Sequence, residues 1–425
     1  MAAEENRTAI TRLSGLLNNG ETNVFPFSTA LFTKTISFLH LYATAMLSFL
    51  QPLFLFLLML FLPGPPEEKP GPVKFRKQFI SAESFESVGV FDVNGDKVPD
   101  LVSGCFWYEG PGYAKRHFIT DVKRYGEYYD DFATIPVDLN GDGRLDFVTG
   151  GWFAETLRWH ENPGNDKPWP EHAIAKTGNI ETVRAWDVDG DGSPELVPNT
   201  PGKPLAFYKA KTGANSAPVF TRTEVTKTHE HGLGFGDINK DGRGDFIIAS
   251  GWLEAPKNPL TEPWTLHPEF SISHASVPIV VTDVNHDGLT DLIAGKGHDY
   301  GLFWFEQRKD RKGKRTWHQH PIDLNNSQFH EMQWVDITND GQPELITGKR
   351  YRAHNGKDPG ADDNLGLYYY SWNGESFTKN IISYGPLGEG VGTGIFFSVA
   401  DLRGNGRRDI IVAGKQGLYI FYNEG

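Results

Sequence analysis

The chain has a single cysteine, Cys105, among its 425 residues. One thiol excludes an internal disulfide, so the fold has to be stabilised by its core or by bound ions. The cysteine count does not fix the compartment, because bound cations can replace disulfides outside the cell.

The second absence is local: no Asp, Glu, Lys or Arg occurs from Thr35 to Pro66. This run is long enough to span a bilayer. Residues 35–63 are therefore predicted to be a signal-anchor helix, or a signal peptide if translation starts at Met46; a buried core helix is the third interpretation. Both export readings place the following domain in the periplasm, outside the cell or anchored at a membrane.

The two flanks of this apolar run carry less information. Residues 1–34 form a leader that shows no clear pattern, and residues 64–73 read as a proline-rich linker. The membrane is therefore expected as a partner only through the apolar segment, and only if that segment is not cleaved.

In contrast, one acidic pattern recurs along the chain, and Asp237 to Asp245 shows it in full. Oxygen side chains stand at its first, third, fifth and ninth positions, and glycine stands at the sixth. A hard cation such as Ca²⁺ needs several oxygens on one short loop, and glycine allows the sharp turn around it.

Seven copies start at residues 92, 138, 187, 237, 283, 336 and 401, the last being degenerate. We expect structural Ca²⁺ in the better copies. The predicted ligands are Asp92, Asn94, Asp96, Asp100, Asp138, Asn140, Asp142, Asp146, Asp187, Asp189, Asp191, Glu195, Asp237, Asn239, Asp241, Asp245, Asp283, Asn285, Asp287, Asp291, Asp336, Asp340 and Glu344.

Each acidic loop lies between two short apolar runs, as in a strand–turn–strand unit, and no acid stands at the twelfth position of an EF-hand. The spacing of the copies fits one four-stranded propeller blade each. We therefore predict an all-β, seven-bladed β-propeller over residues 74–425. Residues 74–80 resemble the outer strands of the blades, so they are predicted to complete the last blade. No third strand is evident in blade four.

The net charge of −13 arises largely from the acidic loops. Bound divalent ions would largely cancel it, so the acidity describes the loops rather than the whole surface. We expect a monomer with a carbohydrate or other small-molecule ligand and with no nucleic-acid partner.

The acidic loops join first and second strands and thus share one face of the propeller. Loops leading into first strands and out of second strands lie on the opposite face, near the axis, and carry six of the fourteen histidines. Converging imidazoles can bind a transition metal such as Zn²⁺ or act as general acid and base. Satisfied surface histidines are the alternative.

Roles on this face follow from side-chain chemistry. His231, His298 and His330 are the candidate bases or metal ligands, with Tyr300, Lys349 and Arg352 assisting as proton donor or as cations beside a developing enolate. The candidate substrate-binding residues are His229, His274, Glu181, Trp152, Trp252, Arg350 and His354; the two tryptophans could stack on a sugar.

The acidic loops resemble the FG-GAP/VCBS repeats of integrin alpha-chain propellers and of many secreted bacterial proteins. A closer resemblance lies in the segments 231–237, 297–302 and 348–356, which are similar to the propeller domain of the aldos-2-ulose dehydratase family. That resemblance implies water elimination from a keto-sugar or anhydro-sugar. Seven-bladed polysaccharide lyases also use His and Tyr for β-elimination.

Three hypotheses remain open at this point. The chain is a dehydratase or lyase, a non-catalytic integrin-like binding and adhesion module, or a structural repeat domain of a larger assembly. The enzyme hypothesis predicts that the imidazoles of His231, His298 and His330 converge in one pocket.

Overall fold

The computed structural model describes residues 71–213 and 216–425. The predictions for the leader at 1–34, the apolar segment at 35–63 and most of the linker at 64–73 lie outside the described residues. Among the residues described, no helix has the length and apolar character needed to cross a membrane.

The described chain forms seven four-stranded antiparallel sheets, one per predicted blade, which confirms the all-β seven-bladed propeller. The first three blades are β2 (Gly89–Phe91), β3 (Asp100–Ser103), β4 (Phe106–Tyr108) and β5 (Arg116–Phe118); β8 (Ile135–Val137), β9 (Asp146–Gly150), β10 (Thr156–His160) and β11 (Glu171–Lys176); and β12 (Thr182–Trp186), β13 (Glu195–Asn199), β14 (Leu205–Gly213) and β15 (Ser216–Thr226).

The remaining blades follow the same order from the first strand to the outer strand. They are β16 (Leu233–Gly236), β17 (Asp245–Ile248), β18 (Gly251–Glu254) and β19 (Thr265–His267); β20 (Val280–Thr282), β21 (Asp291–Gly295), β22 (Tyr300–Lys309) and β23 (Arg315–Ser327); β24 (Phe329–Val335), β25 (Glu344–Lys349), β26 (Leu365–Trp372) and β27 (Phe377–Gly385); and β28 (Ser398–Ala400), β29 (Asp409–Gly414), β30 (Gly417–Asn423) and β1 (Phe75–Ser81).

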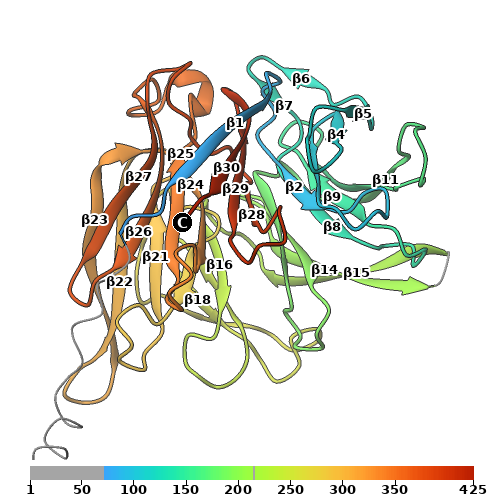
Figure 1. Ribbon diagram of the computed structural model, residues 1–425. Helices are drawn as coiled ribbons and strands as arrows, with labels where there is room; N and C mark the ends of the chain where they lie inside the picture. Colours follow the sequence, from blue (N-terminus) through green and yellow to red (C-terminus); the bar gives the residue numbers. More distant parts are fainter. Residues whose placement is uncertain (1–70, 214–215) are drawn as a thin grey trace, which may run out of the picture. The chain divides into compact units, whose positions relative to one another are not determined.

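The last blade takes its outer strand from the other end of the domain. β1 pairs antiparallel with β30, from Phe75 opposite Asn423 to Ser81 opposite Leu418, and the two strands lie side by side in Figure 1. The strand predicted at 74–80 is thus observed. It closes the ring by pairing an otherwise free edge of β30.

Deleting residues 75–81 from the full chain should expose the edge of β30 and leave blade seven with three strands. We expect the melting temperature to fall by at least roughly 5 °C and the protein to self-associate through the free edge. Calorimetry and size-exclusion chromatography check both effects. Lys77→Ala is the control, because it keeps the backbone pairing; unchanged behaviour of the deletion variant would contradict the assigned role of β1.

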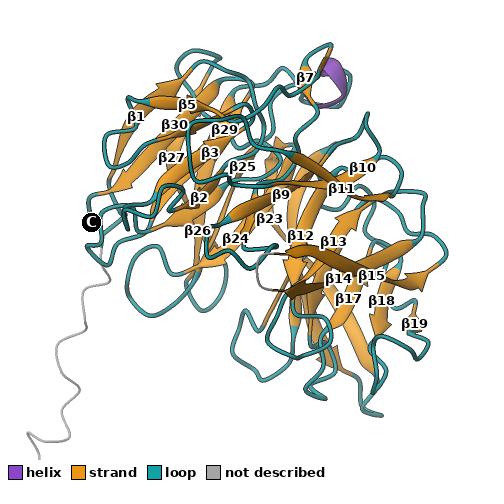
Figure 2. Cartoon of the chain, turned by 90° about the vertical axis from the view of Figure 1, so that its right-hand side faces the viewer, coloured by secondary structure: helices purple, strands orange, loops and turns teal. Residues whose placement is uncertain are grey.

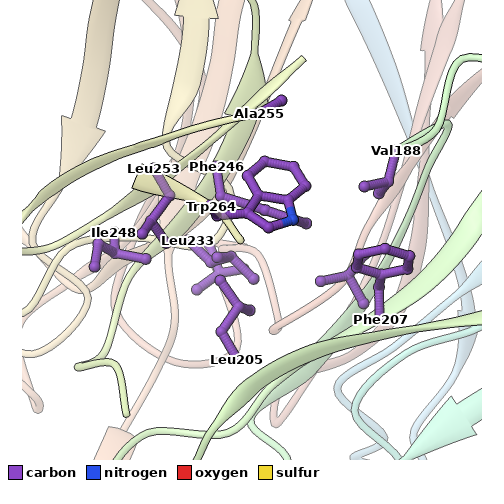
Figure 3. Packing of buried hydrophobic residues seen from close by; sticks show 11 residues of the cluster. Val188, Leu205, Phe207, Leu233, Phe246, Ile248, Leu253, Ala255 and Trp264 are labelled. Carbon is purple, nitrogen blue, oxygen red and sulfur yellow. The ribbon is translucent and has the colours of Figure 1, made fainter. Parts of the chain in front are cut away.

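The core lies between neighbouring blades. Second strands such as β17 are buried along their whole length, because both faces of each sheet pack against another blade. Between blades three and four, Phe207, Phe246 and Trp264 pack with aliphatic side chains (Figure 3). Burying such a side chain contributes about 1.5–3 kcal/mol, which explains the apolar runs on either side of each acidic loop.

Each acidic loop forms the hairpin between a first and a second strand, with a repeated hydrogen-bond pattern. In blade four, Asp237 accepts from the N–H groups of Asp241 and Gly242, and the buried Asp245 carboxylate accepts from Ile238 N and Ala255 N. The sixth position has a positive φ in all seven copies, 86° at Gly242 for example. This left-handed conformation is why glycine recurs there.

Blade one has Lys97 at that position, with φ of 69°. A side chain in the left-handed region costs about 1–2 kcal/mol, so Lys97→Gly should raise the free energy of unfolding by about 1 kcal/mol. Chemical denaturation measures the change. Val98→Gly, at the next position, should destabilise instead and serves as the control.

Two local features differ from the sequence prediction. The third strand of blade four exists: it is β18, and it contains Trp252 and Glu254, so placing Trp252 on an exposed loop was wrong.

The hairpin of β6 (Arg124–Tyr125) and β7 (Tyr128–Tyr129) and the 3₁₀ turn η1 (Ala353–Gly356) were not predicted. Figure 2 shows η1 beside β7; the hydroxyl of Tyr128 accepts from Asn355 N at 2.9 Å.

Candidate functional site

Four side chains from four consecutive blades converge at one point. Glu181 Oε2 lies 3.0 Å from His231 Nε2, and Glu181 Oε1 lies 3.1 Å from His330 Nε2 and 3.6 Å from His298 Nε2. His231 Nε2 and His298 Nε2 are 3.2 Å apart. The three imidazoles therefore do converge, and we call these four residues the Glu–His₃ cluster.

The topology of the blades explains the convergence. Glu181 immediately precedes β12, His231 precedes β16, His330 is in β24, and His298 lies between β21 and β22. These positions are at the start of first strands or the end of second strands. They are thus at the opposite end of the strands from the acidic loops.

The charge state of the cluster is set by burial and by mutual contacts. Although burial alone raises the pKa of Glu181, the neighbouring imidazoles hold it well below its usual value. Burial and the nearby Arg350 guanidinium lower the pKa of His330 well below its usual value. Although burial lowers the pKa of His231, the Glu181 carboxylate raises it above its usual value, so the cluster without an ion pairs an ionised Glu181 with a charged His231 beside a neutral His330. A metal ion would therefore have to displace the proton of His231.

Groups behind the cluster orient its rings. His231 Nδ1 donates to the carbonyl oxygen of Ala275 at 2.6 Å, and His298 Nδ1 lies 2.8 Å from Asp358 Oδ2. These partners direct both Nε2 atoms toward Glu181. A carboxylate or carbonyl behind a histidine is the usual outer shell of a protein metal site.

The spacing of the four donor atoms also suits a divalent ion. Its four ligand atoms all lie within 4.8 Å of one another. Ligands about 2.0–2.2 Å from a common ion are separated by about 3.0–3.5 Å, close to the distances given above. The atom of His330 at the cluster is Nε2; its Nδ1 is buried with no hydrogen-bond partner among the described residues, so His330 lacks the supporting contact that His231 and His298 have.

A pocket of about 210 Å³ reaches the cluster at Glu181, the one cluster residue among its lining residues. Four of its lining residues are aromatic and four are polar: Tyr128, Phe132, Trp152, Phe153, Glu181, Arg350, His354 and Asn355. Arg350 is buried and held by a bidentate ion pair with Glu86, at 3.0 and 3.1 Å. Its Nη1 lies 3.3 Å from His330 Nε2, so it brings positive charge to the edge of the cluster.

The segment 352–356 forms one wall of this pocket in an unusual conformation. Arg352, His354 and Asn355 all have positive φ, at 52°, 49° and 56°. Non-glycine residues held in this region cost about 1–3 kcal/mol each, and they cluster at functional sites. The conformation places the His354 ring parallel to that of His298, with 4.2 Å between centroids, and His354 Nδ1 2.9 Å from Asp358 Oδ1.

Of the other predicted site residues, four lie at the cluster or its pocket, Arg350 among them. The ring of His274 is 6.1 Å from that of His298, while Trp152 and His354 line the pocket.

The remaining predicted residues lie elsewhere. His229 is buried against Lys203 O and Asn199, and burial lowers its pKa to about 4. Trp252 is 2% exposed and stacks on His267, so it cannot offer a face to a sugar. Tyr300 donates to Asp363, Arg352 pairs with Glu127, and Lys349 faces a different cavity.

Sequence reasoning did not single out Glu86, Asp358, Tyr128 or Phe153. Asp358 stands four residues after His354, and this spacing was the one available signal. Glu86 lies 264 residues before its partner Arg350, so no local pattern connects them.

Seven four-stranded blades with acidic hairpins between their first and second strands define a β-propeller built on a short repeat. The model of the FG-GAP-like repeat family matches residues 106–197 and 283–347 of the chain. No curated protein matches the chain significantly.

Two solved structures illustrate its structural neighbours. One is BBS1N in complex with ARL6DN, soaked with mercury, at 11% identity over 83% of this chain and 97% of that chain, with a TM-score of 0.48. The other is the Bacillus licheniformis rhamnogalacturonan lyase PL11, at 12% identity over 84% of this chain and 74% of that chain, with a TM-score of 0.45.

Proposed function

We propose that the chain is a metal-dependent, carbohydrate-active enzyme that catalyses β-elimination on a keto-sugar or a uronic-acid polymer. The observation that carries the proposal is the Glu–His₃ cluster, which adjoins an aromatic pocket through Glu181. An aromatic wall with a few convergent polar groups is typical of a small-molecule site. The resemblance of segments 231–237, 297–302 and 348–356 to a sugar dehydratase supports the same reaction class.

The ligand set indicates which ions suit the cluster. Four protein ligands complete the shell of tetrahedral Zn²⁺, whereas a six-coordinate divalent ion such as Mn²⁺ or Fe²⁺ retains two open positions. We therefore favour a six-coordinate ion. When bound, it supplies a Lewis acid for the carbonyl oxygen of the substrate.

The chain's own residues account for binding and proton movement. Trp152 and Phe153 offer apolar faces to a sugar ring, and Arg350 places a fixed positive charge where an enolate oxygen would develop. The His354 ring is oriented through Nδ1 by Asp358, which leaves Nε2 to take the proton next to the carbonyl.

An elimination assay tests this proposal. The full chain, first stripped with EDTA and then reconstituted with Mn²⁺, Fe²⁺ or Zn²⁺, is incubated with keto-sugars and uronic-acid polymers. The unsaturated product should appear as ultraviolet absorbance only in the reconstituted protein. Saturable carbohydrate binding without turnover by any metal form would instead support the non-catalytic binding module.

We also propose structural Ca²⁺ in the acidic loops, which an exported protein would meet at millimolar concentration. The loops supply carboxylate and amide oxygens around a left-handed sixth residue in every copy. In blade three a lysine contacts three of the loop acids. Lys209 Nζ lies 2.5 Å from Asp189, 2.6 Å from Asp191 and 3.2 Å from Glu195, so one ammonium group already offsets part of the negative charge of this loop.

Lys209→Met should therefore increase the response of the protein to calcium. Without the ammonium, the three acids repel one another, and we expect a loss of about 1.5–3 kcal/mol in EDTA. Millimolar Ca²⁺ should recover that loss and raise the melting temperature more than in the unchanged protein. Lys211→Met, two residues away, is the control; equal calcium responses of the three proteins would contradict the assigned role of Lys209.

A further inference from the structure

A second cavity, of about 310 Å³, lies at the ends of β23, β25 and β27. It shares no lining residue with the pocket that adjoins the Glu–His₃ cluster. Its volume is within the range of about 300–1,000 Å³ that is usual for small-molecule sites. The side chains that matter for its chemistry are those of Asn325, Ser327, Lys349, Asp363, Asn364 and Tyr384.

Lys349 forms the floor of this cavity and is only 2% exposed. Its Nζ donates to Ser327 Oγ at 2.9 Å and to the carbonyl oxygen of Gly360. An ammonium group has three donors, so one remains for a ligand. Burial lowers the pKa of Lys349 to about 8. Burying a charged amine costs free energy, and an apolar side chain would fill the same space without that cost.

The walls of this second cavity carry both hydrogen-bond acceptors and hydrogen-bond donors near its opening. Asp363 accepts from the Tyr300 hydroxyl at 2.5 Å, and Asp362 pairs with Arg352 at 2.5 Å. Each carboxylate thus keeps an oxygen for a ligand. The amides of Asn325 and Asn364 are exposed at the same cavity.

We propose that this second cavity binds a neutral polyhydroxyl ligand, with a hexose unit as the matching size class. An anionic ligand would meet the carboxylates of Asp362 and Asp363, and a cationic ligand would meet Lys349. A hydroxyl group can donate to a carboxylate and accept from an amide or ammonium group at once. Tyr384, 55% exposed at the rim, offers a ring face to the C–H side of a sugar.

The site uses no ion of the Glu–His₃ cluster, so it is tested on the full chain in millimolar Ca²⁺, which keeps the acidic loops supplied, with no transition metal added. Saturation-transfer NMR and calorimetric titration with D-glucose, D-galactose and D-mannose should detect saturable binding of at least one of them. The double variant Asn325→Ala/Asn364→Ala should bind about tenfold more weakly, because two hydrogen bonds to the ligand are lost. Asn380→Ala, the same change on β27 away from the cavity, should bind as the unchanged protein does.

Several outcomes would overturn the proposal. They are no saturable binding of any of the three hexoses, tighter binding of D-galacturonate than of D-galactose, or equal affinity in the double variant. Should the double variant melt early, Tyr384→Ala provides a second test at an exposed side chain, where loss of ring stacking should also weaken binding. The titration needs neither an ion in the Glu–His₃ cluster nor turnover. Its failure can therefore be distinguished from failure of the proposed elimination activity.

Discussion

Replacing His298 with alanine should lower the affinity of the protein for a divalent metal ion by at least about a hundredfold. Loss of an outer-shell partner already costs 10- to 100-fold in metal affinity. In the proposed site His298 is an inner ligand, and its ring is oriented by Asp358. The remaining carboxylate and two imidazoles would keep a weak site. Turnover in the elimination assay should fall with metal content.

The measurement is metal content by mass spectrometry after dialysis against Mn²⁺, Fe²⁺ and Zn²⁺, with affinity from competition with a chelator. His318→Ala is the matched control, because His318 is an exposed histidine on β23. Asp358→Asn should give an intermediate loss. Equal metal content in the His298 and His318 variants would show that the cluster is a hydrogen-bonded group without an ion.

The blade count and the two faces could be predicted because each depends on a local pattern. The acidic turn marks where a first strand ends and a second strand begins. The other end of each of these strands must then lie on the opposite face. His231, His298 and His330 could then be assigned to one face from chain order alone. Blade four shows the limit: β18 reads Gly-Trp-Leu-Glu, too short and too polar at its ends to be recognised as a strand.

Strand geometry explains why one predicted site residue, Lys349, lies away from the cluster. Lys349 and Arg350 are adjacent at the end of β25, and successive side chains of a strand point to opposite sides. Arg350 therefore reaches the cluster, while Lys349 reaches the second cavity. Sequence position brings both to the rim but does not decide which of the two cavities each one enters.

Contacts across the ring were beyond the reach of sequence reasoning. Glu86 lies between the outer strand β1 and the first strand of blade one, yet it pairs with a residue of blade six. Closure of the ring creates this contact, and the ring is specified by all seven blades together. The same holds for the second prediction of large effect, which concerns an ion pair between blades three and six.

Arg184→Met should destabilise the protein by about 3–5 kcal/mol, because it leaves the Glu331 carboxylate buried without its partner. Arg184 Nη1 lies 3.1 Å from Glu331 Oε1, and the second nitrogen contacts Glu331 Oε2 and the carbonyl oxygen of Val277. Arg184 is in β12 and Glu331 in β24, so the pair joins two first strands that are 147 residues apart. The side chains are 11% and 0% exposed.

The free energy of unfolding from denaturant titration measures this loss, and two further variants test its cause. Arg184→Met/Glu331→Gln removes the unpaired charge, so it should recover more than half of the loss. Arg222→Met breaks the exposed pair with Glu224 and should change stability by less than about 1 kcal/mol. If the double variant is no more stable than Arg184→Met, the loss comes from packing of the arginine against Phe396 rather than from a stranded carboxylate, and the ion pair is then not what ties the two blades together.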